Sequence, residues 1–143
     1  MATSASQPVS VQDHNKQLLM RWFQQVWNHG NRDVIYELFA ADGVIHDGDQ
    51  IIKGPAEFEH FYDRLHGQFK DFHISPVLVI AEGDYVCMHW IASQTHVHSG
   101  KSTSASGTSI VRVQNGKFLE AWQNWDAAGL LAQLSDAPPL QVF

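Results

Sequence analysis

Residues 108–125 read TSIVRVQNGKFLEAWQNW, and this stretch decides the fold. Apolar and polar side chains alternate on both sides of Asn115-Gly116, which is the pattern of two β-strands that each bury one face. Asn-Gly between two such segments is the strongest short-range signal of a β-hairpin, because this dipeptide suits a tight two-residue turn. The last two strands are therefore predicted to be antiparallel neighbours.

The same alternation continues toward the N-terminus. Gly83-Asp84, Ser99-Gly100 and Asn115-Gly116 are turn signals that divide it into strand-length segments. A short β-branched run over 43–48 predicts one further, brief strand. The four long predicted strands are 72–82, 84–98, 103–114 and 117–125.

Helical periodicity predicts three helices before the long strands and one after them. The first spans about residues 12–28, begins at the capping pattern of Ser10 and Asp13, and ends at Gly30. The third begins at Gly54-Pro55, where the missing N–H of proline costs nothing. The last follows Asp126 and should end before 138–139. The apolar positions of the second, third and last helices are Val34, Ile35, Leu38 and Phe39; Phe58, Phe61, Tyr62 and Leu65; and Ala127, Leu130, Leu131 and Leu134.

The composition indicates one globular domain over residues 12–143, preceded by a flexible tail over residues 1–11. With 44% hydrophobic and 17% charged residues, the chain is too apolar to be disordered. A net charge of −6 disfavours nucleic-acid binding, because it repels phosphates. The single cysteine, Cys87, excludes an intramolecular disulfide. Because neither a membrane-spanning segment nor an export signal is visible, a cytoplasmic protein is expected.

Three helices followed by a long antiparallel sheet predict an α+β fold in which the helices cover one face of the sheet. The expected shape is a conical barrel. It consists of a curved antiparallel sheet with three N-terminal helices packed on it, an apolar pocket between these layers, and a short C-terminal helix.

Several short motifs carry a family resemblance by their order and spacing. They are Val26-Trp27-Asn28-His29-Gly30-Asn31, Gly54-Pro55, Ile80-Ala81-Glu82-Gly83-Asp84, Thr95-His96 and Trp122-Gln123-Asn124-Trp125-Asp126-Ala127-Ala128-Gly129-Leu130-Leu131. Over about residues 12–135 the chain resembles the SnoaL-like polyketide cyclase family, of the nuclear-transport-factor-2-like (NTF2-like) fold.

The resemblance implies a mostly apolar pocket and a homodimer formed through the open face of the sheet. It also implies ring closure by intramolecular aldol condensation, with protein acid and base groups and without metal or cofactor. The same fold carries isomerases, dehydratases, hydrolases and binding modules, so the activity has to be inferred from the site.

Asp126 matches the catalytic acid/base aspartate of that family by its position after the last strand. A carboxylate in a dry pocket can remove an acidic C–H proton from a carbonyl compound. The same residue directly precedes the last helix, where aspartate is also a good N-cap, and capping would lower its pKa and weaken it as a base. Both interpretations stay open on the sequence alone.

Alternation along 117–125 gives two faces, of which one can line the pocket. The face with Trp122 and Asn124 is chosen because it also contains Asp126. On this hypothesis Trp122 stacks on a planar substrate and Asn124 hydrogen-bonds its carbonyl, while core packing and a turn contact are the alternatives. The chosen face is Glu120, Trp122, Asn124 and Asp126, and the other is Leu119, Ala121, Gln123 and Trp125.

Along 84–98 the even-numbered residues are predicted to face the core, which places Trp90 and Gln94 in the pocket and His96 at its opening. A neutral His96 could protonate an enolate oxygen or orient a carbonyl, and a solvated strand end is the alternative. His96 and His98 form an H-x-H pair, but without a third ligand at a recognisable spacing no metal site is predicted. The predicted substrate-binding residues are Trp122, Asn124, Trp90, Gln94, Tyr62 and Phe58.

His46-Asp47 is a second polar pair, at the end of the predicted strand 43–48. In isomerases that share this fold, a carboxylate at the end of a comparable strand removes the proton, so the resemblance makes Asp47 an alternative base, with His46 beside it. A turn over Asp47-Gly48-Asp49 is the competing interpretation.

Two functions from different classes follow. The first is a cofactor-independent cyclase or isomerase-type enzyme acting on a hydrophobic carbonyl substrate, with Asp126 as base and His96 or His46 polarising the carbonyl. The second is a small-molecule-binding or dimerisation module without chemistry. Convergence of His96, Asp126 and Asp47 around one cavity would favour the enzyme, whereas scatter would favour the binding module.

The expected partners are a small hydrophobic molecule and a second copy of the chain, with no nucleic acid and no membrane. Tyr85, Cys87 and Ile91 alternate with the core-facing residues of 84–98, so they are predicted to lie on the outer face of the sheet. Apolar side chains on that face favour a dimer contact.

Overall fold

The computed structural model describes residues 9–135. Most of the predicted tail and the predicted helix end before 138–139 lie outside these residues. No helix within 9–135 combines the length and apolar character needed to cross a membrane. The helical segments are α1 (Val11–Trp22), the π-helix η1 (Phe23–Asn28), α2 (Asp33–Leu38), α3 (Gly54–Gln68) and α4 (Ala127–Ser135). The strands are β1 (Phe39–Asp47), β2 (Gln50–Lys53), β3 (Phe69–Glu82), β4 (Tyr85–His96), β5 (Ser102–Gln114) and β6 (Lys117–Trp125).

The six strands form one sheet in the order β2-β1-β6-β5-β4-β3. The predicted antiparallel pairing of the four long strands is confirmed, and β1, whose neighbour was not predicted, pairs with β6 in parallel. The two strands are far apart in the chain, so no tight turn forces them to be antiparallel. A further strand that was not predicted is β2, which has four residues and pairs with the end of β1.

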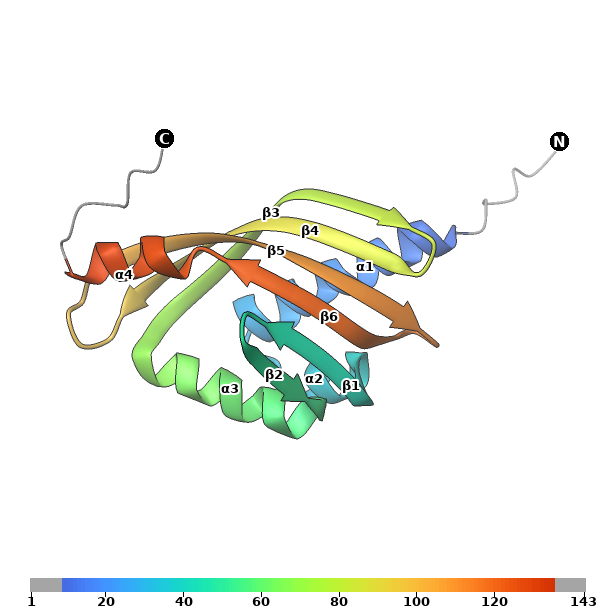
Figure 1. Ribbon diagram of the computed structural model, residues 1–143, viewed down its shortest axis with the longest axis horizontal. Helices are drawn as coiled ribbons and strands as arrows, with labels where there is room; N and C mark the ends of the chain where they lie inside the picture. The colour runs from blue at the N-terminus through green and yellow to red at the C-terminus, as the bar shows by residue number, and fades with distance from the viewer. Residues whose placement is uncertain (1–8, 136–143) are drawn as a thin grey trace, which may run out of the picture.

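The fold is α+β, as predicted, with helices packed on one face of a curved sheet that does not close. Figure 1 shows α1 behind the sheet, α3 along its lower side, and α4 beyond the end of β6. Among the described residues no helix covers the opposite face, which we call the outer face. The concave inner face is therefore where a ligand can be enclosed.

The N-terminal helix begins where the sequence predicts. Ser10 Oγ accepts a hydrogen bond from the main-chain N–H of Asp13 at 3.1 Å, which confirms the predicted cap. The predicted helix over about 12–28 is continuous but changes character, because α1 passes directly into η1. π-helical turns are rare and often lie at functional sites.

The backbone conformation at two predicted element boundaries can be compared with the residues found there. Gly30 adopts a φ of +68° just past η1, in agreement with its predicted role as the stop of the first helix. Asn115 and Gly116 have φ values of 53° and 72°, which confirms the predicted hairpin between β5 and β6. Phe39, predicted as the end of the second helix, is instead the first residue of β1.

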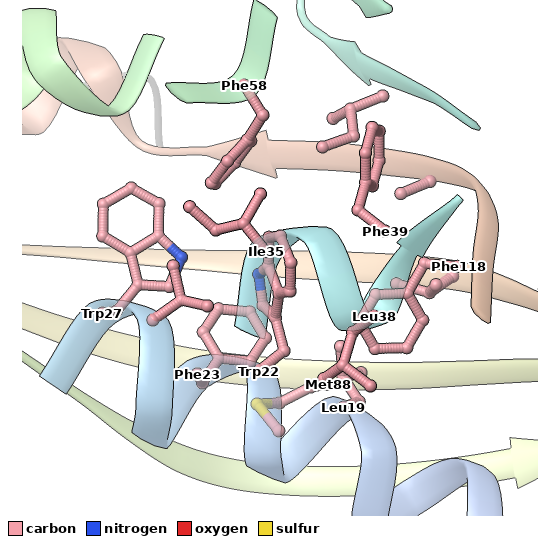
Figure 2. Close-up of a cluster of buried hydrophobic side chains, with 14 of the residues drawn as sticks. Leu19, Trp22, Phe23, Trp27, Ile35, Leu38, Phe39, Phe58, Met88 and Phe118 are labelled. Carbon is pink, nitrogen blue, oxygen red and sulfur yellow. The ribbon is translucent and has the colours of Figure 1, made fainter. Parts of the chain in front are cut away.

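Aromatic side chains hold the helices against the inner face (Figure 2). The ring of Trp22 in α1 lies 4.9 Å from that of Phe58 in α3 and 5.6 Å from that of Phe118 in β6, measured between centroids. Such pairs contribute about 0.5–1.5 kcal/mol each beyond the burial of their area. These contacts fix α1, α3 and the sheet around one core.

Candidate functional site

An apolar cavity lies between the inner face of the sheet and the helical segments η1, α3 and α4. Its wall is mostly aromatic and aliphatic, so exclusion of water would provide most of the binding free energy of a ligand. Gln94 of β4 and Gln123 of β6 supply the amides of this wall. The wall consists of Phe23, Trp27, Phe61, Leu65, Phe69, Phe72, Ile74, Trp90, Ala92, Gln94, Ala105, Gln123, Trp125 and Leu130.

A β-bulge determines which residues of β6 reach the cavity. Val113 of β5 pairs with Phe118, while the residue before Val113 pairs with Glu120, so Leu119 is an extra residue in β6. Phe118 and Ala121 are both buried in the core although they are three positions apart. Beyond the bulge, the odd-numbered residues of β6 face inward.

The prediction of which face of β6 lines the pocket is therefore wrong. Gln123 and Trp125 line the cavity, whereas Trp122 lies on the outer face and stacks on His46 with 5.7 Å between ring centroids. Asn124 is exposed and is not part of the wall. The face had been chosen because it contains Asp126. Since side chains alternate between the two faces, this one choice assigned every residue of the strand beyond the bulge to the wrong face.

A chain of hydrogen bonds crosses the inner face from β4 to β6. Trp90 Nε1 donates to Ser109 Oγ at 3.1 Å, and Ser109 Oγ donates to Gln123 Oε1 at 3.3 Å. Gln123 is the β6 partner of Asp47 in β1, and hydrogen bonding from Gln123 and Trp125 lowers the pKa of the Asp47 carboxyl, against the larger effect of burial. Asp47 therefore borders two side chains of the cavity wall.

The environment of Asp47 alters its proton affinity. Burial raises the pKa of this carboxyl, and the hydrogen bonds from Trp125 and Gln123 oppose that increase. The side chain is half-buried at the end of β1 and directly precedes the Gly48-Asp49 turn. A carboxylate with a raised pKa binds a proton more strongly, which is what removal of a C–H proton requires.

Trp27 contributes an indole N–H that donates to no group among residues 9–135. The ring lines the cavity, and Figure 2 shows its nitrogen on the edge turned toward the interior of the cluster. Trp27 and Gln123 also line a second, neighbouring pocket, so both border the same region of the interior. An indole N–H without a protein partner can hydrogen-bond the oxygen of a carbonyl or enolate that reaches it.

Asp126 caps α4. Its Oδ1 accepts a hydrogen bond from the main-chain N–H of Gly129 at 2.9 Å, which confirms the capping interpretation. The residue is not part of the cavity wall, whereas Leu130, one turn into α4, is. Asp126 therefore secures the helix that closes this side of the cavity.

His46 lies on the outer face. Its Nε2 is 2.7 Å from Glu120 Oε2, and its ring stacks on Trp122. Since adjacent strand residues point to opposite faces, His46 and Asp47 cannot act on the same ligand, although the sequence analysis paired them.

His96 lies far from Asp47. Asp47 pairs with Gln123 of β6, and the pairing continues across the sheet through Ser109 of β5 to Met88 of β4. His96 lies eight residues beyond Met88 along β4. Eight residues correspond to roughly 25 Å of strand. His96 Nδ1 is 2.8 Å from Ser99 Oγ in the loop that follows β4, and the residue is outside the cavity wall. His96, Asp126 and Asp47 therefore do not converge.

The remaining predicted binding residues divide in two. Trp90 and Gln94 line the cavity, as predicted. Tyr62 and Phe58 are buried but belong to the core: the Tyr62 hydroxyl donates to the Val26 carbonyl at 2.9 Å, and Phe58 lines the second pocket. Both stiffen the helices behind the wall.

Sequence reasoning missed Ser109, Gln123, Trp125 and Trp27 as site residues. Trp27, Gln123 and Trp125 stand inside the motifs that carry the family resemblance, yet these motifs do not say which side chains face inward. Ser109 carried a weak signal, since it is a hydroxyl on the face that Val111 and Val113 bury. Within residues 9–135 no group of three His, Cys, Asp or Glu side chains is placed to hold a metal ion.

Comparison with known proteins agrees with this architecture. The model of the SnoaL-like domain matches residues 19–121, which is most of the chain. No curated protein matches the sequence.

Several solved structures are similar. A candidate SnoaL-like polyketide cyclase from Jannaschia sp. CCS1 aligns with a TM-score of 0.82 and 18% identity, over 94% of this chain and all (100%) of that chain. IdmH, a candidate polyketide cyclase from Streptomyces antibioticus, aligns with a TM-score of 0.77 and 22% identity, over 85% of this chain and 98% of that chain. A protein with a ketosteroid isomerase-like fold from Catenulispora acidiphila DSM 44928 aligns with a TM-score of 0.76 and 18% identity, over 85% and 94% of the two chains. At these identities the likeness shows the fold.

Proposed function

The chain belongs to the SnoaL-like domain family, and on that premise we propose that it is a cyclase or isomerase-type enzyme that acts on a hydrophobic carbonyl compound with its own acid and base groups. The observation that carries the proposal is the position of Asp47. Its half-buried carboxylate lies beside Gln123 on the neighbouring strand, and hydrogen bonding from Gln123 and Trp125, which line an apolar cavity, acts on its pKa. Two solved structures of similar fold are described as candidate polyketide cyclases, which agrees with this class of substrate.

Asp47 replaces Asp126 as the proposed base. Asp126 is hydrogen-bonded to the start of α4, whereas burial raises the pKa of Asp47. The carboxylate of Asp47 would remove a proton from the carbon next to the substrate carbonyl, leaving an enolate. General base catalysis of this kind contributes about 10²–10⁴-fold to a rate.

Two N–H groups are available to the enolate oxygen. One is the indole N–H of Trp27, and the other is the second amide hydrogen of Gln123, whose oxygen accepts from Ser109. In a cyclase the enolate carbon would attack a second carbonyl of the same molecule, forming a C–C bond, and the resulting alkoxide would take the proton back from Asp47. In an isomerase the proton would return to another carbon.

A binding module is the second candidate, and one observation favours it. His96, Asp126 and Asp47 do not converge, which leaves Asp47 as the single predicted acid/base group beside the cavity. A module of this kind would use the same apolar wall to hold a ligand without altering it.

One experiment separates the two candidates. The probe is a dihydroanthracenone, a tricyclic compound with the ketone on a terminal ring and acidic hydrogens beside it. Quenching of tryptophan fluorescence reports binding, because Trp27, Trp90 and Trp125 line the cavity. Proton NMR in deuterium oxide reports exchange of the acidic hydrogens. The enzyme is expected to bind the probe and accelerate the exchange, whereas binding without acceleration favours the module.

We also propose that two copies pair through their outer faces. Side chains that are apolar except for His46 cross this face in one row, in which each residue lies opposite the next on the neighbouring strand. Ile80, Ile110 and Ile51 of this row are 55%, 41% and 53% exposed, which is a large apolar surface for a monomer. The row consists of Ile80, Cys87, Ile110, Trp122, His46 and Ile51.

A further inference from the structure

Gln94 lies at the end of the cavity remote from Asp47, and its side chain is the polar group of that end. Only 6% of the residue is exposed, and it shares the wall with Phe69, Ala92 and Leu130. A buried amide among apolar side chains is costly unless its hydrogen-bonding groups are used. The partners of Gln94 therefore indicate what this end of the cavity can recognise.

The neighbouring Thr103 fixes which way the amide points. Gln94 Nε2 donates to Thr103 Oγ1 at 2.9 Å, and the Thr103 hydroxyl donates in turn to the main-chain carbonyl of Gln94 at 3.3 Å. Because its single hydrogen is directed to that carbonyl, the hydroxyl presents a lone pair to the side chain. The amide must meet it with nitrogen, and its oxygen is turned away.

Gln94 Oε1 accepts no hydrogen bond from any residue within 9–135. Among the described residues, every side-chain oxygen or nitrogen that is fully buried has a hydrogen-bond partner. Because Gln94 Oε1 has no such partner, this atom must be in contact with open space. Gln94 lines the cavity, so the cavity is the open space that this side chain borders. The remote end thus offers an acceptor that only a ligand can satisfy.

We propose that Gln94 is a specificity residue that selects ligands with a hydroxyl group at the end remote from the reacting carbonyl. This inference rests on the proposed function, since it takes Asp47 to mark the reacting end. The two ends of the cavity bind opposite hydrogen-bonding groups. Gln94 accepts a hydrogen bond from a ligand, whereas Trp27 and Gln123 donate to a carbonyl oxygen of the ligand. The ligand class is an elongated, apolar hydroxy-ketone.

The sheet register supports an elongated ligand. Gln94 is opposite Thr103 on β5, and Gln123 is opposite Ser109 on the same strand. Six residues therefore separate the two amides along β5, which is roughly 20 Å of strand before curvature. Gln94 therefore sets a hydroxyl preference at its own end of the cavity, and this preference can be measured with a molecule that is shorter than the separation of the two amides.

Three versions of the dihydroanthracenone probe test the inference. One is unsubstituted, one carries a hydroxyl on the terminal ring opposite the ketone, and one carries a methoxy group there. Binding is measured by tryptophan fluorescence. The hydroxyl compound is expected to bind roughly tenfold more tightly than the methoxy compound, which is the ratio for one additional hydrogen bond.

Variants assign the preference to the amide. Gln94→Leu should reduce the ratio to about one by removing the acceptor. Thr103→Val should reduce it too, because the amide is then free to turn, and Thr103→Ser should restore it. Gln114→Leu, at the exposed end of β5, is the matched control and should keep the wild-type ratio.

Equal affinity of the wild-type protein for the hydroxyl and methoxy compounds overturns the inference, as does a preference that survives in Gln94→Leu. Failure of all three compounds to bind also overturns it. Because the measurement is binding, these results are separate from the exchange experiment that tests Asp47. A hydroxyl preference without any exchange would support Gln94 while contradicting the proposed base.

Discussion

His46 and Asp47 are consecutive residues of β1 that point to opposite faces of the sheet. His46 Nε2 lies 2.7 Å from Glu120 Oε2 on the outer face, whereas Asp47 pairs with Gln123, which faces inward. One residue of register therefore separates a surface pair from the proposed catalytic base. The proposed chemistry of the protein depends on this alternation.

The raised pKa of Asp47 predicts a pH-dependent stability. A carboxyl whose pKa is higher in the folded than in the unfolded protein binds its proton more tightly when the protein is folded. Its contribution to stability therefore falls as the pH rises from the pKa of the unfolded state through that of the folded state. Asp47→Asn should therefore raise the midpoint temperature of unfolding near neutral pH. The gain should shrink as the pH falls below 3.8, the ordinary value of an aspartate. Thermal unfolding followed by circular dichroism across this range checks the prediction, and a gain that is constant with pH would contradict it.

The cap formed by Asp126 predicts a stability loss of a different kind. Asp126→Ala removes the acceptor for the Gly129 N–H and should cost about 1 kcal/mol in the free energy of unfolding, measured by urea denaturation. Asp126→Asn should cost much less, because asparagine is an equally good N-cap. Equal losses in the two variants would show that the carboxylate charge, and not the cap, is what matters.

Substitution of Gly107 tests how tightly the cavity wall is packed around Trp90. A Cβ at this position would lie 2.6 Å from Trp90 Cη2 and 2.8 Å from the Asn124 carbonyl oxygen. Gly107→Ala should therefore displace the Trp90 ring, cost about 1–3 kcal/mol in stability and weaken binding of the dihydroanthracenone probe.

Gly67→Ala is the control for this substitution, because it lies in α3 with nothing within 4 Å of an added Cβ. It should leave probe binding unchanged and stabilise the protein slightly, since alanine favours a helix more than glycine does. Unaltered probe binding in Gly107→Ala would mean that the ligand does not contact the Trp90 wall.

The proposed pairing of outer faces predicts the effect of a charge at their centre. Ile110→Lys places an ammonium group inside the apolar row and should convert the dimer to a monomer, as measured by light scattering after size-exclusion chromatography. Leu131→Lys, on the exposed side of α4, should leave the mass unchanged. A wild-type protein that elutes at monomer mass would contradict the pairing.

The fold was largely predictable because local chemistry and tertiary structure agree. Asn115-Gly116 forces the last hairpin, and Ser10 and Gly30 bound the first helical segment. The parallel pairing of β1 with β6 could not be predicted, because no local signal specifies which distant strands meet.

The site was less predictable, because alternation along β6 gives two faces and does not say which of them the sheet turns inward. The face was chosen by Asp126, which caps α4, so Gln123 and Trp125 were assigned to the wrong side. The ambiguity of Asp126 had another source, since an aspartate before a helix suits both a cap and a base. Only the direction of its carboxylate toward Gly129 separates the two.

The central claim is that Asp47 and not Asp126 is the base. Its most direct test is the rate at which the acidic hydrogens of bound dihydroanthracenone exchange in deuterium oxide, compared between Asp47→Asn and Asp126→Asn at saturating probe. Both variants keep side-chain size and remove one carboxylate. The account predicts a loss of about 10²-fold or more in Asp47→Asn and a change of less than about twofold in Asp126→Asn. A large loss in Asp126→Asn with full exchange in Asp47→Asn would contradict it.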